Sequence, residues 1–259
     1  MHSELANIRA IFFDLDDTLC NYWEASKAAL RSTFDQHPVA GYSTDELYEA
    51  WAKAFRKFAP TLKKTPWYKT YLEFGEPTRT EQMRLTLSEL GAVDEHHAKA
   101  FSDTYGATRD DNLRLFDDAL DVLNTLKEFY PLGLITNGPA DIQRQELRTL
   151  KIEHYFDPVL IEGEMGFGKP EPDVYAIALR HMRGKLPNLL PSEILMVGNS
   201  FGHDILGAHL HGWKTAWIRR DSDIPPSTNK PEEKPEGSPD PTTTIYSLTE
   251  LLNALPNRG

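Results

Sequence analysis

Three carboxylates follow one short apolar run near the start of the chain. The run at 11–13 leads directly into Asp14, and Asp16 and Asp17 come within the next three positions. Like charges this close raise one another's pKa unless a cation offsets them. Mg²⁺ suits that role because it prefers oxygen ligands. The pattern indicates a magnesium site at the end of a buried strand; the alternative is an acidic loop that holds at most a weak structural cation.

Three later segments carry polar residues of the kinds that bind phosphate. Thr136 and Asn137 close a second apolar run, where a hydroxyl and turn amides could hold an anion, although an ordinary strand-to-helix cap has the same pattern. Lys169 stands in a loop whose flanking glycines and prolines restrict the backbone, which a merely solvated lysine would not need. Asn199 and Asp204 follow a further apolar run with an amide and another carboxylate.

Apolar runs alternate with helical periodicity, which predicts the elements that position these residues. The runs are bounded by acidic, Gly or Asn residues, as buried parallel strands are, and lie at 10–13, 132–135, 158–161, 194–197 and 215–218. Helical spacing fills the gaps between the later runs. Strand alternating with helix predicts an α/β fold with a doubly wound parallel sheet. In such sheets ligands bind at the carboxyl ends of the strands, near the switch point.

A long interval without a convincing strand separates the first two runs. Capping boxes at 43–46 and 78–81 each precede apolar residues that are spaced for one helix face. We therefore expect an all-helical domain inserted at residues 21–112. The remaining residues, 1–20 and 113–259, would form a discontinuous core.

The segment 221–241 differs from the rest of that core. It is dense in Pro, Ser, Lys, Glu and Asp and has almost no large apolar residue. Such a segment buries too little to order itself, so we expect a flexible loop.

The inserted helices also contain a local reversal of charge. No Asp or Glu interrupts six cations, and aromatic residues are interleaved with them; the cations are Lys53, Arg56, Lys57, Lys63, Lys64 and Lys69. One interpretation is a solvated helix face. The other is a surface that faces the active site and attracts an anionic substrate.

Composition excludes several classes of function. The 259 residues include 28 Lys and Arg against 39 Asp and Glu, and the net charge of −11 gives no overall basic field for nucleic acid or anionic lipid. Cys20 is the only cysteine, so an intrachain disulfide and a cysteine-rich zinc site are excluded. No apolar run is long enough for a membrane span, and no signal-peptide pattern begins the chain. We expect a cytoplasmic protein without nucleic-acid or membrane partners; the oligomeric state is not indicated.

The ordered motifs resemble those of the haloacid dehalogenase-like (HAD) hydrolases. They are Asp-Leu-Asp-Asp-Thr from residue 14, Thr-Asn-Gly from 136, Gly-Lys-Pro from 168 and Gly-Asn-Ser-x-x-x-Asp from 198. The resemblance covers residues 8–220. It implies a Rossmann-like core and identifies the inserted helices as a C1-type cap.

The resemblance also implies a role for each residue. Asp14 would be the nucleophile that forms an aspartyl-phosphate. Asp16 would protonate the leaving group and then activate water. Thr136 and Asn137 would bind the transferring phosphoryl, and Lys169 would neutralise charge on the nucleophile and the phosphate.

Mg²⁺ would be bound by Asp14, the backbone carbonyl of Asp16 and the pair Asn199 and Asp204. The family usually has Asp where this chain has Asn199. An amide oxygen can still ligate the ion but adds no charge, so we expect weaker metal affinity. Whether Asn199 or Asp204 touches the ion stays open.

These residues together predict a Mg²⁺-dependent phosphatase that hydrolyses a small phosphomonoester. The ester is a dianion, so a carboxylate attacks it only if Mg²⁺ and lysine screen the repulsion. One alternative is a 2-haloacid dehalogenase; Asp16 argues against it because halide leaves without protonation. Another is a catalytically weak phosphate-binding module, which Asn199 keeps open. Sugar phosphates, nucleotides, phosphoglycolate and acylneuraminate phosphates all fit as substrates.

Overall fold

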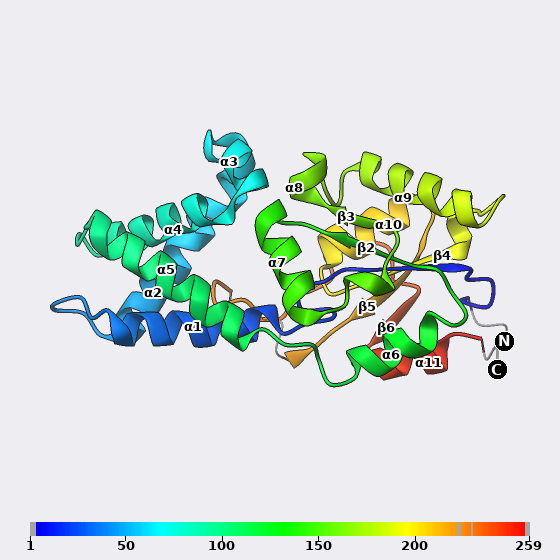
Figure 1. The fold of residues 1–259 in the computed structure, drawn as a ribbon, viewed down its shortest axis with the longest axis horizontal. Helices are drawn as coiled ribbons and strands as arrows, with labels where there is room; N and C mark the ends of the chain where they lie inside the picture. Colours follow the sequence, from blue (N-terminus) through cyan, green and yellow to red (C-terminus); the bar gives the residue numbers. More distant parts are fainter. Residues whose placement is uncertain (1–3, 222–223, 229, 257–259) are drawn as a thin grey trace.

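The computed structural model describes residues 4–221, 224–228 and 230–256, and a parallel sheet lies at the centre of its core (Figure 1). Every neighbouring pair of strands is parallel. The spatial order is β3-β2-β1-β4-β5-β6, which confirms the predicted doubly wound α/β sheet. The strands are β1 (Ala10–Phe13), β2 (Leu132–Thr136), β3 (Val159–Ile161), β4 (Ile194–Gly198), β5 (Lys214–Ile218) and β6 (Thr243–Ile245).

Helices cover both faces of this sheet because alternate strand residues point to opposite sides. In β1, Ile11 and Phe13 pack in one apolar layer with residues of α6 (Ala119–Leu126), α7 (Ala140–Leu150) and α11 (Leu248–Ala254). Ala10 and Phe12 pack in the other layer, against α9 (Pro172–Lys185) and α10 (Gly207–Leu210). Short helical segments fill the connections: η2 (Glu153–Tyr155), α8 (Glu162–Met165), η3 (Pro191–Glu193) and η4 (Phe201–Leu206).

The inserted region is helical, as predicted, and stands beside one end of the sheet (Figure 1). Its apolar interior includes Leu30, Trp51, Met83 and Phe101, so these helices bury a core of their own. Its elements are α1 (Tyr22–Gln36), α2 (Thr44–Phe58), η1 (Ala59–Lys64), α3 (Trp67–Glu73), α4 (Gly75–Glu89) and α5 (Glu95–Asn112).

One of the two predicted helix starts in this region is confirmed. Ser43 and Glu46 form a reciprocal capping box at the start of α2. Thr78 does not begin a helix, because α4 already starts at Gly75 and Thr78 is buried inside its first turns. The physical reason is that the backbone of Phe74 is extended and the N–H of Gly75, the first residue of α4, donates to Asp141 Oδ1 over 3.0 Å.

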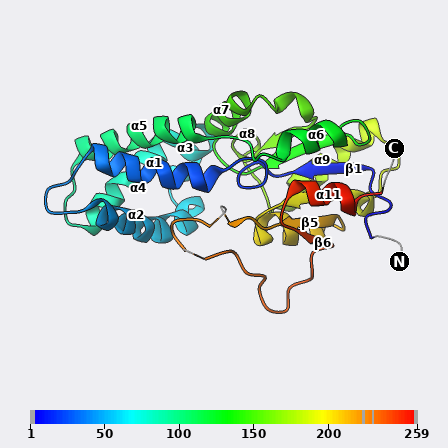
Figure 2. The same ribbon diagram turned by 90° about the horizontal axis from the view of Figure 1, so that it is seen from below.

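The segment 221–241 connects β5 to β6 and runs toward α2 (Figure 2). Its described residues form no strand and no α-helix, as expected of a loop. They nevertheless make specific contacts: Arg56 donates to the Ser227 carbonyl over 2.6 Å, and the Glu232 carboxylate accepts from the Phe201 N–H over 2.8 Å. The expectation that this segment buries little is wrong for Ser227, which is buried. Flexibility of the whole segment stays a prediction.

Among the described helices, none combines the length and the apolar character that crossing a membrane requires.

Candidate active site

The carboxyl end of β1 places Asp14 beside the switch point of the sheet, where its N–H donates to the Val197 carbonyl of β4 over 2.9 Å. The Lys169 ammonium lies 2.5 Å from Asp14 Oδ1 and 2.6 Å from Asp204 Oδ1. Thr18 Oγ1 donates to the second Asp14 oxygen over 3.1 Å. All four side chains are buried. The fold therefore brings together three of the residues that the sequence singled out from widely separated segments.

Burial dominates the electrostatics of this cluster. It raises the pKa of Asp14 to about 6, while Lys169 opposes the shift and the charge of Asp204 adds to it. Burial also raises the pKa of Asp204. For Lys169 burial acts to lower the pKa, but the two carboxylates outweigh it and raise the pKa above the ordinary value. One ammonium therefore contacts two buried carboxylates. It offsets the charge of only one of them, so the cluster retains negative charge.

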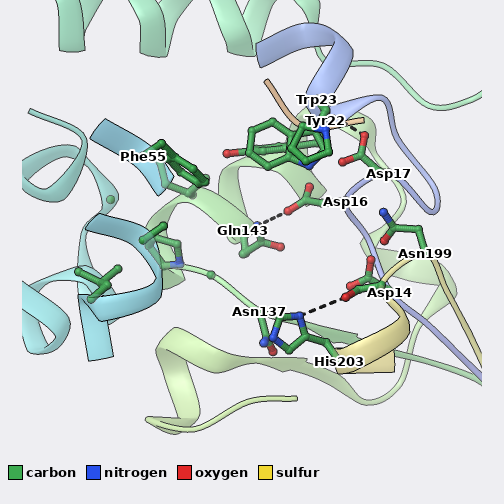
Figure 3. A pocket seen from close by; sticks show the side chains of 18 of the residues that line it. Asp14, Asp16, Asp17, Tyr22, Trp23, Phe55, Asn137, Gln143, Asn199 and His203 are labelled. Atoms are coloured by element: carbon green, nitrogen blue, oxygen red, sulfur yellow. Dashed lines mark hydrogen bonds between the residues drawn. The ribbon is translucent and has the colours of Figure 1, made fainter. Parts of the chain in front are cut away.

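A side chain of the core helix α7 holds Asp16 in place. Gln143 Nε2 donates to Asp16 Oδ2 over 3.0 Å, and the side chain of Asp16 lies between Gln143 and the ring of Tyr22 (Figure 3). Burial and the charge of Asp14 raise the pKa of Asp16 to about 6. A carboxyl group with such a pKa is available as both acid and base near neutral pH, as proton transfer in two half-reactions requires.

Thr136 and Asn137, which are expected to bind the phosphoryl group, form hydrogen bonds within the protein. Thr136 Oγ1 is buried and donates to Gln143 Oε1 over 2.6 Å. The Asn137 amide accepts from the Lys169 N–H over 2.8 Å and donates to the Lys169 carbonyl over 2.7 Å. Asn137 thus fixes the backbone that presents Lys169. Binding of phosphoryl by Thr136 and Asn137 stays a prediction.

The end of β4 supplies the remaining expected metal ligands. Asp204 Oδ2 accepts from the Ser200 N–H over 2.9 Å, and a Cβ on Gly198 would lie 2.3 Å from the Asp204 carboxyl carbon. A glycine is therefore needed for Asp204 to reach the cluster. Asn199 is partly exposed beside Asp14 at the cavity wall (Figure 3).

The donor set in this region fits a hard divalent cation. Asp14, Asn199 and Asp204 line one cavity, and the two carboxylates of this cluster share one ammonium, that of Lys169. Within the described ranges, no group of three His, Cys, Asp or Glu side chains is already arranged as a metal site. The Lys169 ammonium contacts the carboxylates of both Asp14 and Asp204.

Sequence reasoning missed a polar cluster on the buried face of α7. Gln143 and Glu146 are both buried, and Gln143 Nε2 also donates to Glu146 Oε2 over 2.9 Å. Burial and the charge of Asp16 raise the pKa of Glu146 well above its ordinary value. The guanidinium of Arg109, from α5, lies 3.8 Å from Glu146. The available signal was two polar residues spaced three apart within an otherwise apolar helix stripe.

A cavity of about 940 Å³ lies between the core and the inserted helices. Asp14, Asp16 and Lys169 line its core side. The inserted helices contribute mostly aromatic, apolar and uncharged polar groups, and these include Tyr22, Trp23, Phe55, Phe58, Leu62, Tyr71, Thr78, Gln82 and Tyr105.

The basic stretch of the inserted helices does not line this cavity with its cations. Lys53 and Lys57 pair with Glu89, and Lys63 lies 2.9 Å from Glu171. The residues of this stretch that do line the cavity are apolar and include Phe55, Phe58 and Leu62. Figure 3 labels Phe55 among them.

The motif residues that converge at this edge of the sheet agree with a comparison of the whole sequence. A family model described as haloacid dehalogenase-like hydrolase matches residues 11–218. The chain belongs to this family. It is therefore an enzyme with a HAD core and a helical cap.

Two curated relatives of this HAD protein match along most of their length. Phosphoserine phosphatase of Thermus thermophilus is 28% identical over 90% of this chain and 94% of its own. Glyceraldehyde 3-phosphate phosphatase of Methanopyrus kandleri is 31% identical over 82% of this chain and 84% of its own.

Solved structures share the fold of both the core and the cap. The putative HAD-hydrolase YfnB of Bacillus subtilis, bound to magnesium, superposes with a TM-score of 0.71 over 97% of this chain and all of that one, at 22% identity. A 2-haloacid dehalogenase of Pseudomonas syringae has a TM-score of 0.60 over 95% of this chain and 97% of that one, at 26% identity.

Proposed function

We propose that this HAD hydrolase is a Mg²⁺-dependent phosphatase that cleaves a small phosphomonoester through an aspartyl-phosphate on Asp14. The observation that carries the proposal is the contact between Asp14 Oδ1 and the Lys169 ammonium, with Thr18 on the other carboxylate oxygen. These contacts fix the orientation of the Asp14 carboxylate and partly neutralise it, so that a dianionic ester can approach it. The relatives named phosphatases support the same reaction.

Asp16 would act on the leaving group and then on water. Its proton would pass to the ester oxygen as the bond to phosphorus breaks, and the resulting carboxylate would take a proton from the attacking water. The raised pKa of Asp16 and the hydrogen bond from Gln143 support this double role. Thr136, Asn137 and Lys169 would contact the phosphoryl oxygens.

Mg²⁺ would be held by Asp14, the backbone carbonyl of Asp16, Asn199 and Asp204. When bound, it would supply positive charge that screens the nucleophile from the phosphate. Residues 21–112 would serve as the cap domain, with 1–20 and 113–259 as the core. A cytoplasmic location and the absence of nucleic-acid partners stay predictions.

A 2-haloacid dehalogenase is the second candidate, because several similar structures carry that name. The carboxyl group of Asp16 favours the phosphatase, since a departing halide needs no proton. The direct test is to assay p-nitrophenyl phosphate and 2-chloropropionate side by side, with Mg²⁺ and with EDTA. We expect phosphate release that depends on Mg²⁺ and no halide release. Halide release without phosphate release would overturn the proposal.

A further inference from the structure

Helix α4 presents a polar patch to the cap side of the cavity. Thr78, Arg79 and Gln82 all line it, and Thr78 and Gln82 share one helix face because they are four residues apart. We refer to these three residues as the α4 subsite. It is formed by a cap helix, whereas the aspartates of the active site come from the core.

Two buried oxygen atoms of the α4 subsite lack a hydrogen-bond partner. Thr78 Oγ1 and Gln82 Oε1 have none among the residues that the structure describes. The orientation of the Gln82 amide is set by its nitrogen, which donates to the Trp51 carbonyl over 3.3 Å. Buried polar atoms are rarely left without a partner, so these two atoms point to a ligand that supplies hydrogen-bond donors.

Arg79 adds a cation that the protein leaves largely unpaired. Its Nε donates to Ser102 Oγ over 3.1 Å, and it forms no ion pair with any described carboxylate. The two buried cations that line the cavity differ from half-buried Arg79, since Lys169 contacts Asp14 and Arg109 contacts Asp110. The Arg79 guanidinium packs against α5.

The residue of α5 next to this guanidinium is Gly106. A Cβ at this position would lie 3.0 Å from the central guanidinium carbon of Arg79. The absence of a side chain at Gly106 therefore lets the guanidinium lie close to α5.

We propose that the α4 subsite binds the organic part of the substrate, and that this part carries a carboxylate beside hydroxyl or N–H groups. The proposal rests on the proposed phosphatase function and names its substrate class. Arg79 would donate to the carboxylate, while Gln82 Oε1 and Thr78 Oγ1 would accept from the neighbouring donors. A sugar acid phosphate or an amino acid phosphate has both features.

The test compares phosphoesters that differ chiefly in the carboxylate. The pairs are 6-phosphogluconate with sorbitol 6-phosphate, and O-phosphoserine with phosphoethanolamine. For at least one pair we expect kcat/KM of the wild-type protein to favour the acid by about tenfold or more. In Arg79→Gln this preference should fall by about tenfold or more, so that most or all of it is lost. The preference is a ratio measured on one preparation, so partial misfolding does not alter it.

Arg84→Gln is the matched control. Arg84 lies on the same helix, contacts Glu81 over 2.7 Å and does not line the cavity, so its loss should leave the preference unchanged. Equal hydrolysis of the acid and its carboxylate-free partner in both pairs by the wild-type protein would overturn the proposal. So would an Arg79→Gln variant that keeps the wild-type preference.

Calorimetry separates this proposal from the proposed function. The same esters are titrated into Asp14→Asn and into Asp14→Asn with Arg79→Gln. Tighter binding of the acid that is lost without Arg79 would support the subsite even if no ester were hydrolysed. Identical binding of acid and neutral ester would overturn it even if p-nitrophenyl phosphate were hydrolysed.

Discussion

The amide of Gln143 donates to the Asp16 carboxylate over 3.0 Å, and its oxygen accepts from the Thr136 hydroxyl over 2.6 Å. One side chain of α7 therefore links the proposed acid and base to a residue expected to bind phosphoryl. Because both ends of the amide are engaged, its orientation is fixed, and the orientation of Asp16 follows from it.

Removing this amide should impair proton transfer more than phosphoryl binding. We expect Gln143→Leu to lower kcat about 10- to 100-fold on an alkyl phosphate, whose leaving group must be protonated. The loss on p-nitrophenyl phosphate should be smaller, because nitrophenolate leaves without a proton. Gln145→Leu is the control, because Gln145 lies on the same helix, is partly exposed and donates to Asp110 rather than to Asp16. Equal losses on the two substrates would mean that Gln143 does not act through Asp16.

The raised pKa of Asp16 predicts a pH-dependent cost in stability. The pKa is raised to about 6 from an ordinary value of 3.8, so the folded chain binds this proton more tightly than the unfolded chain does. The corresponding stabilisation is complete below the ordinary value and is lost as pH rises through about 6.

Asp16→Asn should therefore stabilise the metal-free protein near neutral pH. We expect its melting temperature in EDTA to exceed that of the wild type by a few degrees at about pH 7.5, and by less at about pH 5. Thermal melts at both pH values check this. If the variant melts below the wild type at about pH 7.5, this would contradict the claim that the ionised, buried Asp16 destabilises the fold.

Asn199→Asp tests the expected metal ligands. The new carboxylate adds a charged oxygen beside Asp14, so the Mg²⁺ concentration for half-maximal activity should fall by roughly tenfold. Without Mg²⁺ the extra charge should lower the melting temperature, because it adds to the repulsion with Asp14 and Asp204. An unchanged Mg²⁺ titration would place Asn199 outside the coordination of the ion.

Glu232 tests the attachment of the segment 221–241. Its carboxylate accepts from the backbone N–H groups of Phe201 and Gly202 at the start of η4. We expect Glu232→Ala to lower the free energy of unfolding by about 1 kcal/mol, as the loss of a helix cap does. Glu233→Ala is the control, because it removes a neighbouring cavity carboxylate for which the structure gives no hydrogen bond. It should lower the free energy of unfolding by less than Glu232→Ala does. Similar denaturant curves for the two variants would contradict the attachment.

The sheet and the placement of the aspartates could be predicted because local sequence determines both. Each apolar run ends in polar residues, and a parallel sheet gathers such ends at one edge. The runs before Asp14, Thr136 and Asn199 are the strands β1, β2 and β4 of the structure.

The contacts of the helices and of the segment 221–241 could not be predicted in the same way. Gln143, Arg79 and Arg109 have no motif around them. Each has a partner that lies well apart from it in the sequence: Asp16, Ser102 and Glu146, respectively. The loop contact at Ser227 is made by a backbone carbonyl, on which composition has no bearing. Pairing of Lys63 with Glu171 likewise depends on how the cap docks against the core.

The central claim is that Asp14 becomes phosphorylated. The most direct measurement is acid quenching of Asp16→Asn during reaction with p-nitrophenyl phosphate, followed by mass spectrometry of the peptide that contains Asp14. This variant keeps the nucleophile but lacks the base for the second step, so the peptide should gain the mass of one phosphoryl group. Asp14→Asn treated in the same way should gain none. An unmodified peptide in Asp16→Asn, at a time when that variant has released one equivalent of nitrophenolate, would contradict the account.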